Sequence, residues 1–256
     1  MGIEESRKIK SDETLISIIN LLKEGNKIHV SEIADTLDIA NSTVHGHLST
    51  LHSYGLVRKT GTEYRLGLQF LDYGEVARRE HPLYAPTAET IEELAQSTQE
   101  KVWCIVEENG QAVYLNGASG DRSVKTHARE GQHTKLHHLA AGKAILASLS
   151  PERVEDIIDK HGLPSKTENT ITQKEELLEE IDQIREEGVA YNLGESVIGL
   201  HAIGVSIHDE EDKVMGAISI SAPANRMSQD RMSGDLSQKL KGVANEIELL
   251  FRTDRY

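Results

Sequence analysis

The segment from Ser31 to Leu66, SEIADTLDIANSTVHGHLSTLHSYGLVRKTGTEYRL, most limits what this chain can fold into. Its apolar residues follow helical spacing in two successive runs, and the break Asp38-Ile39-Ala40 separates them. Ser31 can cap the first helix, and Gly55 can end the second in a left-handed conformation. Residues 56–66 then read as a short hairpin with Gly61 in the bend. The segment therefore predicts a helix, a turn, a second helix near 41–54 and a two-stranded hairpin.

The second of these helices has two unlike faces. At helical spacing Val44, Leu48 and Leu51 fall together and must point into the domain, whereas the opposite face is small, polar and nearly free of carboxylates. A polar helix beside a cationic hairpin is the arrangement of a winged helix-turn-helix, in which the helix enters a DNA groove and the wing contacts phosphate or the minor groove. A module that binds only protein is the alternative. The residues expected to contact DNA are Ser42, Thr43, His45, Gly46, Ser49, Arg58, Lys59 and Arg65.

The charge of the chain opposes this interpretation at first sight, because DNA binders usually present a basic face. The net charge is −14, but residues 1–80 hold 10 Lys and Arg against 12 Asp and Glu, so most of the acid lies in the remainder. A cytoplasm rich in salt would reconcile the acid with DNA binding, since the screening length falls to about 3 Å near 1 M salt. Acid-rich surfaces are typical of such proteomes.

Length and composition favour a two-domain globular protein. The 256 residues include 38% hydrophobic and 27% charged residues, and no apolar run approaches the roughly 18 residues of a membrane span. The N-terminus has no apolar signal core, and Cys104 as the single cysteine excludes an internal disulfide. We expect a cytoplasmic protein with no membrane partner.

The prolines between residues 80 and 86 indicate a domain boundary. We expect a DNA-binding domain over 1–67, a linker helix over 68–85 and a second domain over 86–256. In the second domain, strands with neighbouring partners and flanking helices favour an α+β fold with one antiparallel sheet. Its expected strands cover 102–106, 111–115, 197–208 and 214–221, and its expected helices include 140–149, 154–158, 177–187 and 236–251.

Motifs for catalysis or metal binding are mostly lacking. Ala141-Gly142-Lys143 is not a phosphate loop, because His137 and Ala144 stand where that motif needs a glycine and a hydroxyl. If the segment around His137 and His138 is a strand, the two rings point to opposite sides and at most one could serve a given metal site. With no HExxH or CxxC motif, we expect neither a metal, a cofactor nor a catalytic group, and we expect Cys104 to lie in the core. Further histidines in this domain include His127, His133 and His201.

Two parts of the sequence resemble one known family. SEIADTLDIANSTVHGHLSTLHSYGLV with RKTGTEYRLG resembles the N-terminal domain of IclR-type transcriptional regulators. KLHHLAAGKAIL, IREEGVAYNLGESVIGLHAIGVSIHD and GAISISAPANRMSQD resemble their effector-binding domain. The likeness covers about residues 10–251. It implies a GAF-like effector domain, assembly as a homodimer or dimer of dimers, and control of catabolic genes, as repressor or activator, through an organic acid, a sugar or an aromatic acid.

The resemblance also implies where a small-molecule effector binds. Two physical arguments support this location. Amides at a helix N-terminus favour a carboxylate, and alternate serines project from one strand face. Asn192 and Ala202 stand where some members that bind small keto acids carry an acidic residue and a cysteine, so a different ligand is expected. Gly46 replaces an arginine common in the recognition helix. The implied ligand-binding residues are Ser123, Thr126, Ala140, Ala141, Asn192, Leu200, Ala202, Ser219 and Ser221.

The sequence therefore predicts a regulator that binds an operator in double-stranded DNA under the control of a metabolite. A metabolite-processing enzyme with an appended helix-turn-helix, and a ligand-sensing module that binds protein, are the alternatives. The enzyme would require turnover that depends on His137, His138 or His201.

Overall fold

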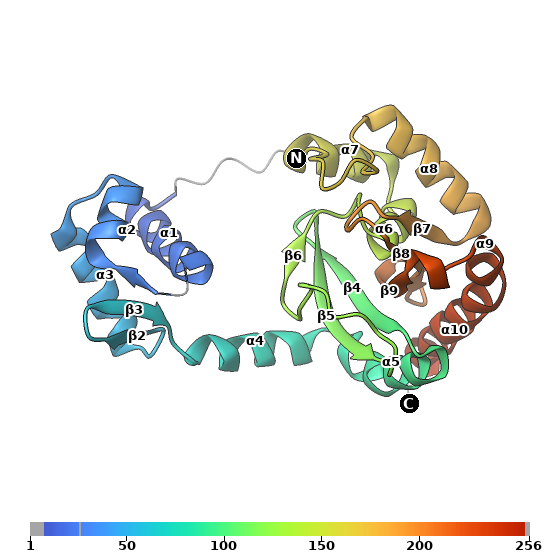
Figure 1. The fold of residues 1–256 in the computed structure, drawn as a ribbon, viewed down its shortest axis with the longest axis horizontal. Helices are drawn as coiled ribbons and strands as arrows, with labels where there is room; N and C mark the ends of the chain where they lie inside the picture. The colour runs from blue at the N-terminus through green and yellow to red at the C-terminus, as the bar shows by residue number, and fades with distance from the viewer. Residues whose placement is uncertain (1–7, 26, 254–256) are drawn as a thin grey trace. The chain divides into compact units, whose positions relative to one another are not determined.

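The computed structural model describes residues 8–25 and 27–253. The chain divides into two compact units, Met1–Ala77 and Arg78–Tyr256, and the division falls inside helix α4 (Gln69–Glu80). Each unit has a hydrophobic core of its own. Figure 1 traces the chain through both units.

The first unit is a small helical domain with a three-stranded antiparallel sheet in the order β1-β3-β2. Its core consists of apolar side chains such as Ile18 and Ile33 beneath the sheet residue Tyr64. The predicted order of helix, turn, helix and hairpin is confirmed. The elements are α1 (Lys10–Gly25), β1 (Ile28–His29), α2 (Val30–Leu37), α3 (Asn41–Ser53), β2 (Val57–Thr60) and β3 (Glu63–Leu66).

The predicted start of α2 was wrong. Ser31 is not the N-cap, because the helix already begins at Val30 and its cap residue is His29. The backbone N–H of His29 donates to Glu32 Oε2 over 2.7 Å, and His29 also pairs with Glu63 of β3. The sheet pairing therefore fixes where the helix begins, and this long-range contact leaves no local signature.

The second unit is an α+β domain, as predicted, built on one six-stranded antiparallel sheet in the order β6-β5-β4-β9-β8-β7. The predicted hairpin around Asn109 and Gly110 is confirmed, and both residues have positive φ (55° and 83°) as a tight turn requires. Sequence patterns missed β6 and β7 and began β8 three residues early. The strands are β4 (Lys101–Glu108), β5 (Gln111–Ser119), β6 (His133–Thr134), β7 (Ala190–Leu193), β8 (Leu200–His208) and β9 (Val214–Pro223).

Helices cover both faces of this sheet (Figure 1). One face packs against α5 (Tyr84–Thr98) and α10 (Ser237–Thr253), with Cys104 in that core as predicted. The other face packs against α6 (Ala140–Ala147), α7 (Pro151–His161) and α8 (Lys174–Glu187). Short turns join β9 to α10, namely η1 (Ala224–Arg226), α9 (Gln229–Arg231) and the π-helical turn η2 (Met232–Leu236).

Candidate nucleic-acid interface and ligand site

The helix α3 presents a free polar face. Val44 and Leu48 are fully buried and Leu51 nearly so, because their helical spacing forms the only apolar stripe of the helix. The predicted recognition residues lie outside this stripe and are exposed to solvent. They are Ser42, Thr43, His45, Gly46 and Ser49.

The hairpin β2–β3 stands directly after α3 and carries the cations. His52 Nδ1 lies 2.9 Å from the carbonyl oxygen of Val57, which ties the end of α3 to the first wing strand. Arg58 and Lys59 are exposed, and within residues 8–25 and 27–253 neither has an ion-pair partner. The Lys59 ammonium lies 5.4 Å from the centre of the Tyr64 ring. Both cations are therefore available to a polyanion.

Arg65 differs from these two. Its side chain is only 34% exposed, and its guanidinium lies 3.9 Å from Glu63, which itself pairs with Lys27 at 3.5 Å. Arg65 Nε is buried without a hydrogen-bond partner. A carboxylate thus already screens this cation, whereas Arg58 and Lys59 have no such neighbour among the ion pairs of the described residues.

Strand register brings several predicted ligand residues onto one face of the large sheet. Asn192 of β7 pairs with Ala202 of β8, which pairs with Ser221 of β9. Residues directly opposite in antiparallel strands share a face, and alternate residues along a strand do so too. Leu200, two residues before Ala202, and Ser219, two before Ser221, therefore join the same face.

The N-terminus of α6 lies directly on this face. Gly204 of β8 allows the approach, because a Cβ there would lie 2.7 Å from Ala141 N and 2.8 Å from the carbonyl carbon of Ala140. Ala140 and Ala141 are buried, and the cap residue Leu139 offers no side-chain hydrogen bond. The first N–H groups of a helix have no partner within the helix. The amide groups at the start of α6 and the strand serines therefore lie on the same face of the sheet.

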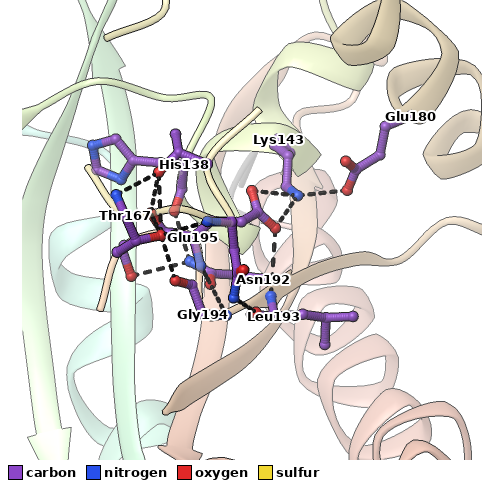
Figure 2. Close-up of polar contacts among 11 residues, drawn as sticks. His138, Lys143, Thr167, Glu180, Asn192, Leu193, Gly194 and Glu195 are labelled. Atoms are coloured by element: carbon purple, nitrogen blue, oxygen red, sulfur yellow. Dashed lines mark hydrogen bonds and ion pairs between the residues drawn. The ribbon is translucent and has the colours of Figure 1, made fainter. Parts of the chain in front are cut away.

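Asn192 is buried in the same region, but its polar atoms are already used (Figure 2). Its amide nitrogen donates to the carbonyl oxygen of His138 over 2.6 Å and to Ser196 Oγ over 3.1 Å. Its amide oxygen accepts from the backbone N–H groups of Gly194 and Glu195 at 3.0 and 2.9 Å. Asn192 therefore links the loop between β7 and β8 to the segment that enters α6.

A buried lysine lies under that loop. Lys143 of α6 is completely buried, and Nζ donates to both carboxylate oxygens of Glu195 over 2.7 and 2.9 Å and also to Glu180 of α8 (Figure 2). Burial raises the pKa of Glu195, although Lys143 opposes this shift. Sequence reasoning missed this cluster. The one signal was a lysine inside the otherwise apolar run AAGKAIL, which would be costly to bury without partners.

The comparisons with known proteins agree across the chain. The family described as "Bacterial transcriptional regulator IclR C-terminal" matches residues 77–249, and "IclR helix-turn-helix domain" matches residues 15–61. The chain belongs to the IclR family of transcriptional regulators. The family consists of regulators and not of enzymes, which confirms the expectation that this chain is not an enzyme.

Individual relatives extend this result. The chain is 32% identical to the probable HTH-type transcriptional regulator ArcR of Halobacterium salinarum, over 97% of this chain and 96% of that one. It is 26% identical to the acetate operon repressor of Salmonella typhimurium, over 92% of this chain and 88% of that one. Among solved structures, the IclR protein of Thermotoga maritima is 26% identical with a TM-score of 0.76, covering 95% of this chain and 99% of that one.

Two residues implied by the IclR resemblance, Ser123 and Thr126, lie on the loop 120–132 between β5 and β6 of the second unit, Arg78–Tyr256 (the effector unit). Ser123 N–H donates to the carbonyl oxygen of Gly120 over 3.0 Å, and Thr126 Oγ1 accepts from Ala128 N–H over 3.4 Å. These local bonds shape the loop and do not join either residue to the serines of β9.

This loop is fixed at one end by ion pairs to the buried carboxylate of Glu100. Arg226 donates to both oxygens of Glu100 over 2.9 and 2.6 Å and to the carbonyl oxygen of Arg122 over 2.7 Å. Burial alone would raise the pKa of Glu100, but the hydrogen bonds from Arg226 and Arg231 outweigh it and lower that pKa. Glu100, immediately before β4, thereby connects the loop to the turns after β9.

The histidines next to α6 do not lie on a strand, and that assumption was wrong. His137 and His138 occupy the tight segment between β6 and α6, with rings 5.2 Å apart. His137 Nε2 lies 3.2 Å from the carbonyl oxygen of Pro164, and His138 Nε2 lies 3.1 Å from Thr134 Oγ1. Burial lowers the pKa of His138 to about 4. No group of three or more potential metal ligands of the types His, Cys, Asp and Glu occurs in the part of the chain that the structure describes.

Two further observations complete the site description. Burial raises the pKa of the Cys104 thiol to about 12, so it is inert at neutral pH. Of the helices in residues 8–25 and 27–253, none has the length and apolar character to cross a bilayer.

Proposed function

We propose that this IclR-type regulator binds operator DNA in the cytoplasm through α3 and the β2–β3 wing, and that a small metabolite in the effector unit adjusts this binding. The observation that carries the proposal is the exposed, carboxylate-poor face of α3 beside Arg58 and Lys59, two exposed cations with no ion-pair partner among the described residues. Small side chains let a helix approach base edges closely, while the two cations contact phosphate.

The effector site is proposed on the sheet face beneath the start of α6. Ser219, Ser221, Leu200 and Ala202 share that face through strand register, and Gly204 admits the helix end next to them. Asn192 would act there by ordering the loop between β7 and β8, since its amide is fully engaged. An organic acid, a sugar or an aromatic acid from a catabolic pathway remains the proposed ligand class. For Ser123 and Thr126 a ligand contact rests on the family resemblance alone.

Helix α4 supports assembly as a homodimer or a dimer of dimers. It buries none of its own side chains, and Leu71, Tyr73 and Val76 on it are more than half exposed, as is Leu68 just before it. Exposed apolar side chains on one helix favour association with a partner, and a second copy would provide the two DNA-binding domains that a palindromic operator requires.

The acidic surface supports function in a salt-rich cytoplasm. Glutamates crowd the solvent side of α8, where Glu175, Glu176, Glu179 and Glu186 are all exposed. Screening at high salt removes most of their mutual repulsion. Folding and specific DNA binding should persist at high salt. If both were best near 0.1 M and failed at high salt, this part of the proposal would be wrong.

The test begins with a genome-wide footprint of the bound protein, which yields operator sequences and neighbouring genes. Fluorescence anisotropy with one such duplex then compares wild type, Arg58→Ala and Lys59→Ala. Each variant should weaken binding to every sequence and reduce the slope of log K against log salt by about 1. Lys23→Ala, which removes an exposed cation from the last turn of α1, is the matched control.

Two results would contradict the proposal. Equal affinity for all duplexes, with no response to any metabolite of the neighbouring genes, would exclude an operator-specific regulator. Binding that is unchanged in both wing variants would remove the wing from the interface.

A further inference from the structure

Lys101, the first residue of β4, lies at the margin of the proposed effector site. It pairs with Ser221 of β9 on one side and with Ser119 of β5 on the other. Trp103, two residues further along β4, shares its face, and the Lys101 ammonium lies 4.0 Å from the centre of the Trp103 ring. Trp103 belongs to the core that packs against α6. Lys101 therefore projects on the same side of the sheet as the start of α6.

The charge of Lys101 has no ion-pair partner within residues 8–25 and 27–253. Nζ donates to Ser119 Oγ over 3.2 Å, which is a neutral acceptor. Burial lowers the pKa of Lys101, and the more distant Glu130 opposes the shift. A half-buried ammonium on an indole face is stabilised by the ring quadrupole, but it still gains from an anion.

A second observation points to a ligand beside it. Ser219 pairs with Trp103 and is only 5% exposed, yet its hydroxyl has no hydrogen bond with any residue that the structure describes. This hydroxyl is therefore free to donate to or accept from a ligand on this face. Leu139 gives the N-terminus of α6 no side-chain cap, so the first amide N–H groups of this helix add further donors on the same face. The ammonium, whose present acceptor is neutral, the hydroxyl and the amide N–H groups therefore all offer hydrogen bonds to an anionic acceptor on one face of the sheet.

We propose that Lys101 determines specificity in the effector site by selecting ligands that carry a carboxylate, with the Trp103 ring as the apolar wall beside it. The inference rests on the proposed function only in taking this sheet face as the effector site. One lysine balances the single charge of a carboxylate, whereas a phosphate dianion would need further cations. A neutral sugar would leave the ammonium without an anion.

The chain offers a direct probe, because Trp103 is its single tryptophan. Full-length protein is titrated with three acids, each against its amide: pyruvate and pyruvamide, gluconate and gluconamide, and 4-hydroxybenzoate and 4-hydroxybenzamide. Trp103 fluorescence is followed in wild type, Lys101→Gln and Lys101→Arg. Lys125→Gln, which removes an exposed cation from the neighbouring loop, is the matched control.

At least one acid should bind to wild type more tightly than its amide. Lys101→Gln should weaken that acid about tenfold or more and leave the amide unchanged, since a hydrogen bond to a charged group is lost. Lys101→Arg should retain the preference, and Lys125→Gln should behave as wild type. Thermal unfolding of each variant verifies that the fold is intact.

Two outcomes would overturn the inference. The acid preference could survive in Lys101→Gln, or none of the three acids could perturb Trp103 in a manner that depends on Lys101. Operator binding is measured separately with the same acid. If acid binding depends on Lys101 but leaves DNA affinity unchanged, the proposed regulation is wrong and the inference stands. If the acid changes DNA binding equally in wild type and Lys101→Gln, the inference is wrong and the proposed regulation stands.

Discussion

The helices α3 and α6 both lack a side-chain cap at the N-terminus, but α3 is largely exposed and α6 is buried. Each starts after an apolar cap residue, Ala40 for α3 and Leu139 for α6, that provides no side-chain hydrogen bond. The helix α3 buries a single stripe, whereas all residues of α6 from Ala140 to Ala147 are buried, a lysine among them.

This difference separates two kinds of recognition. A helix that packs by one stripe leaves a whole face for a macromolecular groove, and its uncapped start can meet a phosphate. A helix buried on every side can offer only its end, and only to a ligand small enough to enter the fold. Burial, more than local sequence, therefore determines which ligand each helix can contact.

The largest effect should come from the buried cation of α6. Lys143→Met removes the charge that pairs with Glu195 and Glu180 and leaves their carboxylates unbalanced. Breaking a buried pair from one side costs about 3–5 kcal/mol. Urea unfolding of the effector unit, followed by Trp103 fluorescence, measures the loss.

Lys174→Met is the matched control, because its pair with Glu155 at 3.0 Å is exposed to solvent and should matter little. A Lys143→Met protein as stable as wild type would show that the charge inside α6 is not structural. The contrast with α3 would then rest on apolar burial alone.

Acid should lower the free energy of unfolding through protonation of His138, in the segment that precedes α6. Burial holds the pKa of His138 at about 4 in the fold against 6.5 as its ordinary value. Between these pH values the unfolded chain takes up a proton that the folded chain excludes. Stability is therefore lost as pH falls from about 6.5 towards about 4, by up to roughly 3 kcal/mol.

His138→Gln removes this contribution, whereas titrating groups distant from His138 change alike in both proteins. The difference in unfolding free energy between pH 7 and pH 4.5 should be smaller in the variant than in wild type. Parallel pH curves would mean that His138 is already charged in the fold.

The sequence was sufficient wherever the decisive contacts are local. The two faces of α3 follow from helical spacing, and the turn at Asn109 and Gly110 follows from residues that tolerate positive φ. The partners of Lys143 lie 37 and 52 residues away, so no local pattern could indicate them. The strand β7 spans only Ala190–Leu193 and is too short for alternation to be recognised.

The candidate sites divide in the same way. Exposure of Ser42 and Gly46 could be predicted from periodicity, and their contact with DNA stays a prediction. The resemblance indicated Asn192 as a ligand residue, but only coordinates show its amide committed to a loop. Lys101 escaped notice because its significance depends on Trp103 and on a register with β9.

Adding a single methyl group at Gly204, beneath α6, or at Gly46, on α3, tests the same comparison. Gly204→Ala would place a Cβ 2.7 Å from Ala141 N and should destabilise the effector unit by about 1–3 kcal/mol. Gly46→Ala meets nothing within 4 Å on the exposed face of α3 and should stabilise the first unit by about 1 kcal/mol. Thermal unfolding measures both, and equal shifts of one sign would refute the assignment of one helix to solvent and the other to the core.

The smallest effect concerns α2, the helix that packs against α3. Unlike α6, it has a side-chain hydrogen bond at its N-terminus. Glu32→Ala removes the carboxylate that accepts the His29 N–H over 2.7 Å and should cost about 0.5–1 kcal/mol. Ser31→Ala, at the position that sequence alone favours as the cap, should change stability by less than about 0.5 kcal/mol, since Ser31 is exposed inside the first turn. Urea unfolding of the two variants side by side resolves the difference.

A larger loss in Ser31→Ala would mean that the helix begins later in solution, with Ser31 as its cap. That result would also loosen the link between β1 and α2, because the cap at His29 and the pairing of His29 with Glu63 depend on the same backbone conformation.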